Sequence, residues 1–189
     1  MNQVIEAIRT RRSVRSMKEE KPPKELIEQV IEAGTWAPNH HLTEPWRFVV
    51  ISGDERRKLG ETMENALRET IKRDEPRRDE ILRAEREKTL AAPVIVAVIS
   101  SPSVGEKVVK QEEVIAMGAA VQNMLLAAHS IGLGAMIRTG RHSYSQPVRS
   151  YLDLNERESL AGLVYLGYQA EPPRPTRRSP LDLKVSWRG

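Results

Sequence analysis

Four arginines and a serine lie close together near the start of the chain, and they are the first residues that could do chemistry. They are Arg9, Arg11, Arg12, Ser13 and Arg15. Like charges this close repel one another unless an anion or a carboxylate neutralises them. The arginine guanidinium matches phosphate oxygens, and serine adds a hydroxyl donor. A phosphate clamp is therefore one interpretation, but basic clusters are usually solvated, so this stretch taken alone favours a solvated basic turn paired to nearby glutamates.

Two adjacent histidines form a second group, in a polar loop framed by Pro38 and Pro45. On an extended loop, His40 and His41 point in opposite directions, and no other pair of common metal ligands lies near them in the sequence. A metal site needs several ligands around one point, so no metal site is expected. Polar contact with a ligand, or hydrogen bonds within the loop, are expected instead.

A third group follows the longest uncharged segment of the chain. Residues 114–137 contain no Asp, Glu, Lys or Arg, although 30% of the chain is charged. Their Ala, Leu and Met residues favour a helix, and apolar positions on nearly every face predict a helix buried all round. This helix should end at Gly132, before a short buried strand at 135–137. The strand would place Arg138 and Thr139 at its end, where a ligand could bind.

A membrane span is the alternative for this uncharged segment. Gln122, Asn123, His129 and Ser130 interrupt it, which disfavours a span. The start of the chain lacks the apolar stretch of a signal peptide, and the chain contains no cysteine. We therefore expect a cytoplasmic protein with no membrane partner, no disulfides and no thiol chemistry.

The other elements interleave helices and strands, which indicates an α/β or α+β sheet protein. We expect a single domain over residues 1–189, in which 54–90 forms two charged helices, the second of them solvated or peripheral. The last twenty residues, 170–189, are proline-rich and should form an extended tail along the body, along a partner subunit or loose in solvent. The other expected elements are helices at 2–9, 22–34 and from 147, and strands at 46–51, 93–99 and 158–167.

Taken together, three separated segments resemble the nitroreductase family. Residues 11–15 match its R-x-S-x-[RK] flavin-binding motif, and 37–51 match its AP…PW-x-F-x-V segment. The third segment is 132–140, followed by matches at 147–149 and 162–168. Order and spacing are most similar to the family's short YdjA-type members. The resemblance implies an α+β fold, with a central, mostly antiparallel sheet flanked by helices, and an intertwined homodimer.

The resemblance also implies that FMN binds without a covalent link at the dimer interface. Arg11 and Ser13 would hold the phosphate or the ribityl chain, with Arg12 beside them, and Arg15 would lie near the pyrimidine edge of the flavin. A cation is useful there because reduction places negative charge on that edge. The remaining matches are His40, supplied across the interface, and Ile137, Arg138 and Thr139 at the strand end.

The implied activity is an FMN-dependent NAD(P)H oxidoreductase with a ping-pong mechanism, passing electrons to a nitroaromatic, a quinone or a related small acceptor. Trp36 and Glu44 depart from the family pattern, so the pocket should differ in detail. The first alternative is a flavin-binding or sensing protein with little turnover. The second is a basic nucleic-acid-binding protein, which the sparse and scattered aromatic residues disfavour, so no nucleic-acid partner is expected.

Overall fold

A computed structural model describes residues 2–103, 109–173 and 175–189. Within these ranges the centre of the fold is a four-stranded sheet in the order β1-β2-β4-β3. All three pairs of neighbouring strands are antiparallel, which confirms the α+β fold implied by the resemblance. The strands are β1 (Trp46–Ser52), β2 (Val94–Ser100), β3 (Gly134–Arg138) and β4 (Ser159–Gly167), each within one residue of its expected bounds.

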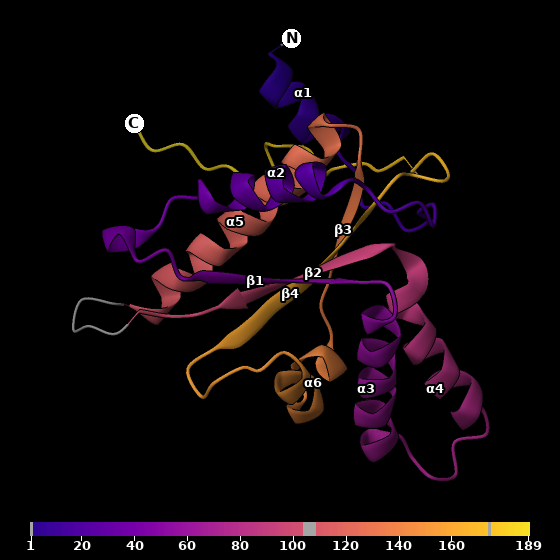
Figure 1. Cartoon of the computed structure of the whole chain (residues 1–189). Helices are drawn as coiled ribbons and strands as arrows, with labels where there is room; N and C mark the ends of the chain where they lie inside the picture. The colour runs from indigo at the N-terminus through magenta and orange to yellow at the C-terminus, as the bar shows by residue number, and fades with distance from the viewer. Residues whose placement is uncertain (1, 104–108, 174) are drawn as a thin grey trace.

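Helices cover both faces of this sheet (Figure 1). α2 and α5 pack on one face, and α3 and α6 pack on the other. The α-helices are α1 (Gln3–Thr10), α2 (Lys24–Thr35), α3 (Glu55–Thr70), α4 (Arg78–Glu87), α5 (Lys110–Ser130) and α6 (Gln146–Tyr151); the short 3₁₀ helices are η1 (His40–Leu42), η2 (Lys88–Ala91) and η3 (Arg141–Tyr144).

The unbroken apolar run of β2 explains why this strand lies inside the sheet. Successive side chains of a strand point to opposite faces. Val94, Val96 and Val98 therefore pack with α2 and α5, whereas Ile95 and Ile99 pack with α3 and α6. A strand buried on both faces needs apolar residues at every position, as predicted from its sequence.

The contact between α2 and α5 depends on small residues. Gly34, in the last turn of α2, lies so close to α5 that a Cβ atom there would be 2.9 Å from the Cγ atom of Met124. Such a distance is shorter than van der Waals contact, so with a larger residue at position 34 the side chain of Met124 would have to move.

α5 differs from its prediction on one face. The helix forms over the expected residues, but Val114 and Ile115 are 60% and 65% exposed, so the expectation of burial all round is wrong for a single chain. The apolar residues Val4, Ile5 and Ile8 of α1 are also exposed. Within the described residues, no helix is both long enough and apolar enough to cross a membrane.

α4 also differs from its prediction. The charged run was expected to be solvated or peripheral, yet Leu82 is 1% exposed and Glu85 is 6% exposed. The packing of α4 against α3 buries one side of α4. A charged residue is therefore held inside the protein, close to the end of the helix.

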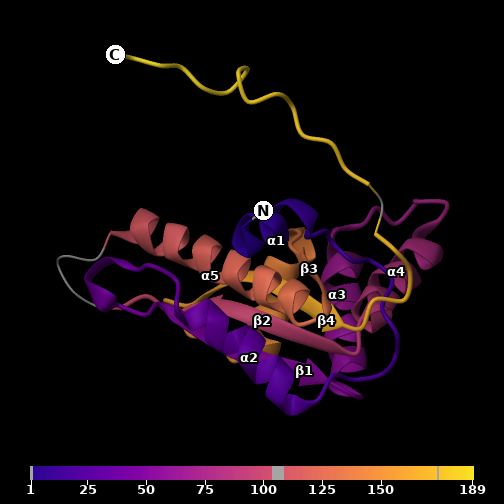
Figure 2. The same cartoon turned by 90° about the horizontal axis from the view of Figure 1, so that it is seen from above.

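The C-terminal segment 175–189 forms no helix or strand. Figure 2 shows it leading away from the body of the protein. Its larger apolar side chains, Leu181, Leu183 and Trp187, are 73%, 74% and 92% exposed. They alternate with polar residues in the sequence, and residues 181–184 form a turn.

A half-buried ion pair joins the start of β1 to the residue before β4. Arg47 donates two hydrogen bonds to Glu158, from Nε to Oε1 at 2.8 Å and from Nη2 to Oε2 at 3.0 Å. The Glu158 side chain is 6% exposed and also accepts a bond from the backbone N–H of Asn155. These bonds, above all those from Arg47, lower the pKa of Glu158 to about 2, although burial acts in the opposite direction.

We expect Glu158→Gln to lower the free energy of unfolding at pH 7 by about 3 kcal/mol, from the pKa difference between the folded and unfolded states. Above the usual glutamate pKa the stabilisation is complete, and it is lost as the pH falls toward the folded-state value of about 2. Urea unfolding between pH 7 and pH 3 should therefore show the gap between wild type and variant narrowing with acid. Glu156→Gln, at an exposed neighbouring position, is the control. A gap that stays constant with pH would contradict this account.

Candidate functional site

The arginine loop, residues 11–15, runs along the edge of β3. The backbone N–H of Val14 donates to the carbonyl of Ala135 at 3.1 Å, and Ser13 forms a parallel bridge with the same residue. Val14 is buried against Gly134, where an added Cβ would lie 2.9 Å from the Cγ1 atom of Val14. Because neighbours in an extended segment point in opposite directions, Ser13 and Arg15 face outward.

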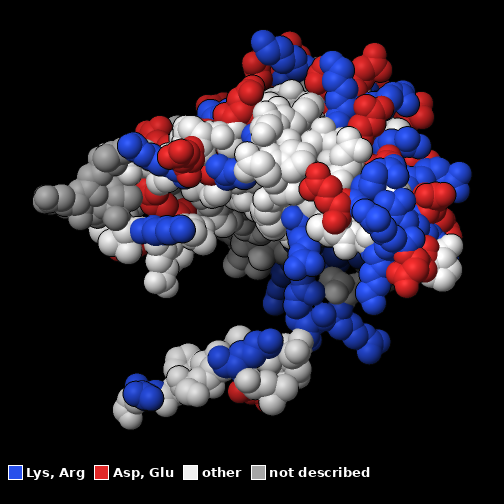
Figure 3. All heavy atoms as spheres, turned by 90° about the horizontal axis from the view of Figure 1, so that it is seen from below, with Lys and Arg blue, Asp and Glu red and all other residues white. Residues whose placement is uncertain are grey.

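The first cavity lies between this loop and the root of the tail. Its volume is about 510 Å³, and its lining residues include Arg11, Arg12, Ser13, Arg15 and Arg178. Figure 3 shows Lys and Arg side chains gathered where the tail leaves the body. An anion is the ligand that so many cations would favour.

Arg11 is the group in this cavity with the clearest need for a ligand. Its Nε and Nη1 atoms are buried and have no hydrogen-bond partner among the described residues. Burial lowers the pKa of Arg11, and the charges of Arg12 and Arg178 lower it further. A buried donor without a partner is costly, so a phosphate bound here would satisfy both the hydrogen bonds and the charge.

Arg12 is arranged differently from Arg11. Its Nη1 atom donates to the carbonyl oxygens of Arg9 and Arg11, at 2.6 Å and 2.8 Å. Part of its guanidinium is therefore used to hold the loop. Arg178 was not expected in the site, because nothing in the proline-rich tail indicated that it would reach the arginine loop.

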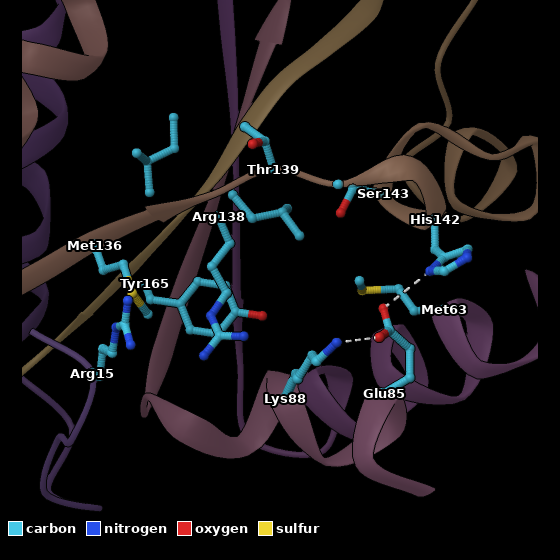
Figure 4. Close-up of a pocket in the computed structure, with 13 residues that line it drawn as sticks. Arg15, Met63, Glu85, Lys88, Met136, Arg138, Thr139, His142, Ser143 and Tyr165 are labelled. Atoms are coloured by element: carbon cyan, nitrogen blue, oxygen red, sulfur yellow. Dashed lines mark hydrogen bonds and ion pairs between the residues drawn. The ribbon is translucent and has the colours of Figure 1, made fainter. Parts of the chain in front are cut away.

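The second cavity has a volume of about 540 Å³ and lies beside β3 and β4. Arg15 lines both cavities, so they adjoin. Figure 4 shows side chains from the arginine loop, α4, η2, β3 and β4 around this space. Its lining contains the expected Arg15, Ile137, Arg138 and Thr139, and also Glu85, Lys88, His142, Ser143 and Tyr165, which were not expected.

Tyr165 and Arg138 are stacked at one wall of the second cavity. The guanidinium of Arg138 lies 5.0 Å from the centre of the Tyr165 ring, within the range of a cation–π contact. The Tyr165 hydroxyl and the Arg138 Nε are buried without a hydrogen-bond partner among the described residues. Burial raises the pKa of Tyr165 to about 12, although Arg138 acts in the opposite direction, so the phenol stays neutral and can donate.

His40 lines neither cavity of its own chain. It lies in η1, where its Nδ1 atom is paired with the carboxylate of Glu112 in the first turn of α5. The structure therefore does not bring His40 together with the arginine loop within one chain. Trp36 is 79% exposed, and Glu44 is exposed as well. Among the residues described here, no three His, Asp or Glu side chains are grouped as metal ligands.

The chain is similar to known proteins over most of its length. The model of the nitroreductase family matches residues 8–168. The chain is 29% identical to YfhC of Bacillus subtilis over 175 residues, 92% of this chain and 88% of YfhC. It is also 29% identical to YdjA of Escherichia coli K12 over 163 residues, 86% of each chain. Both relatives carry provisional names as NAD(P)H nitroreductases.

A solved nitroreductase with bound FMN from Bacteroides fragilis has the same fold. Its TM-score is 0.79 and its sequence identity is 26%, with 100% of both chains covered. The family match spans most of the chain, and it includes the arginine loop and the strands β3 and β4 beside the second cavity. The chain therefore belongs to the nitroreductase family.

Proposed function

We propose that this protein binds FMN and acts as an NAD(P)H oxidoreductase that reduces a nitroaromatic, a quinone or a related electron-poor acceptor. The observation that carries the proposal is the guanidinium of Arg11, which lines a cationic cavity that adjoins a second one. Its buried Nε and Nη1 atoms have no hydrogen-bond partner in the part of the chain that the structure describes. The two cavities suit the phosphate and the ring system of one elongated cofactor. The FMN-bound relative from Bacteroides fragilis supports this assignment.

Bound FMN would supply the redox chemistry, taking a hydride from NAD(P)H and returning the electrons to an acceptor that occupies the same place afterwards. Arg11 and Ser13 would hold the phosphate, with Arg178 beside them. Arg15 and Arg138 would place positive charge beside the ring, where reduction adds negative charge. Tyr165 would offer a neutral hydroxyl donor. This division of roles requires no protein acid or base.

We also propose that the active form is a homodimer. Exposed apolar residues of α1 and α5, among them Ile8, Val114 and Ile115, would be covered by a second copy of the chain. His40 of that copy would then reach the flavin, although it lines neither cavity of its own chain. The exposed, alternating apolar residues of the tail would pack on the second copy as well.

The test is the visible spectrum of the purified protein under nitrogen. We expect a flavin band at about 450 nm that bleaches on adding NADH or NADPH and returns on adding a quinone or a nitroaromatic. FMN alone in the same buffer is the control for reduction without protein. A bound flavin that resists bleaching would indicate a flavin-binding protein with little turnover. A colourless protein that takes up no added FMN would contradict the proposal.

A further inference from the structure

Glu85 is a buried carboxylate at the edge of the second cavity. It is 6% exposed and lies in the last turn of α4, facing the space that Arg15 and Arg138 also line. Lys88 donates to its Oε2 atom, and the Nδ1 atom of His142 lies 3.5 Å from its Oε1 atom (Figure 4). The distance to His142 is longer than a normal hydrogen bond. Because a carboxylate has about four acceptor positions, Glu85 keeps acceptor capacity.

Glu85 differs from the other polar residues around the cavity, because it carries a negative charge and they do not. Arg15, Lys88 and Arg138 are cationic donors, and Thr139, Ser143 and Tyr165 carry hydroxyl groups. Among the described residues that line this cavity, Glu85 is the one carboxylate. A ligand whose edge presents an N–H group between two carbonyl oxygens would suit one acceptor flanked by donors. The pyrimidine edge of a flavin is such an imide, with N3–H between O2 and O4.

We propose that the carboxylate of Glu85 accepts the hydrogen bond of the flavin N3–H and so fixes the orientation of the ring. This inference rests on the proposed FMN binding. The cations nearby would meet the carbonyl oxygens on either side of N3. Lys88 compensates the charge of Glu85, so that its carboxylate does not stand unpaired next to a ring that becomes more negative on reduction.

A purely structural role is the alternative, because Glu85 also links α4 to Lys88 of η2 and to His142 of η3. The two roles predict different binding of FMN methylated at N3, a flavin that lacks the N3–H donor. A structural residue would change the binding of both flavins by the same factor. Loss of a residue that accepts from N3–H would weaken the binding of FMN more than the binding of N3-methyl-FMN.

The experiment titrates flavin-free protein with FMN and with N3-methyl-FMN and follows flavin fluorescence. Wild type should bind N3-methyl-FMN roughly 10- to 100-fold more weakly than FMN, as expected for a hydrogen bond to a charged group. Glu85→Ala should bind FMN more weakly and lose this discrimination. Glu87→Ala, at an exposed position of the same helix, should keep it.

Equal binding of the two flavins by wild type would overturn the inference while leaving the proposed function intact. Discrimination that survives in Glu85→Ala would overturn it as well. If Glu85→Ala does not fold, Glu85→Gln keeps the size of the side chain and a weaker acceptor, and should show discrimination below that of wild type. Failure of wild type to bind either flavin would instead contradict the proposed function.

Discussion

Replacing Arg11 with Ala is expected to raise the dissociation constant for FMN by about 30- to 1,000-fold, the equivalent of about 2–4 kcal/mol for a buried, charge-assisted contact. The reason is the position of the guanidinium. Its Nε and Nη1 atoms are buried and have no hydrogen-bond partner within residues 2–103, 109–173 and 175–189, so the proposed phosphate would be their acceptor. Removing them would leave the phosphate in a cavity with fewer donors and less positive charge.

A titration of the flavin-free protein with FMN and with riboflavin measures this effect. Riboflavin lacks the phosphate, so the variant should bind it about as tightly as wild type does. Arg57→Ala, at an exposed position on α3, should bind both flavins normally. Unchanged FMN affinity in Arg11→Ala, or an equal loss for riboflavin, would show that Arg11 does not hold the phosphate.

The sheet could be predicted from the sequence because its strands are defined by local patterns. The apolar run of β2 and the glycines before β3 identify these strands without knowledge of their neighbours. Unlike the strands themselves, the register in which they pair could not be predicted from local patterns. That register decides the site, because Arg138 stacks on Tyr165 only when β3 and β4 pair as they do here. The sequence shows no feature that fixes this register, so the wall of the second cavity could not be predicted.

The charged run of α4 illustrates a second limit. Most charged runs are solvated faces, and the sequence of α4 was interpreted that way. The signal against it was Leu82, an apolar residue three positions before Glu85 and hence on the same side of the helix. Burial of Glu85 also depends on His142, which is far away in the sequence and comes close only in the folded chain.

Two further features could not be predicted from the sequence. They are the position of Arg178 and the exposure of one face of α5. A proline-rich tail has no periodic pattern that indicates where it lies, so the approach of Arg178 to Arg11 is a property of the fold. For α5, apolar residues on all sides indicate burial but do not say which chain buries them. The structure of one chain leaves Val114 and Ile115 exposed.

This exposed face makes Ile115→Glu the second variant with a large expected effect. In a homodimer with two-fold symmetry, each copy would place one carboxylate in the apolar interface. Burying an unpaired charge costs several kcal/mol, so the dimer should dissociate at least ~100-fold more readily. The fold itself should survive, because Ile115 is 65% exposed in the single chain.

Sedimentation velocity and the flavin content of the same sample measure both consequences. We expect a monomer that has also lost most of its FMN, because His40 of the second copy would no longer reach the ring. Ser150→Glu adds the same charge to an exposed position of α6, on the opposite side of the sheet, and should remain a flavin-bound dimer. A dimer that persists in Ile115→Glu would place the interface elsewhere. A monomer that keeps FMN at wild-type affinity would mean that one chain forms a complete site, and the role proposed for His40 would then be wrong.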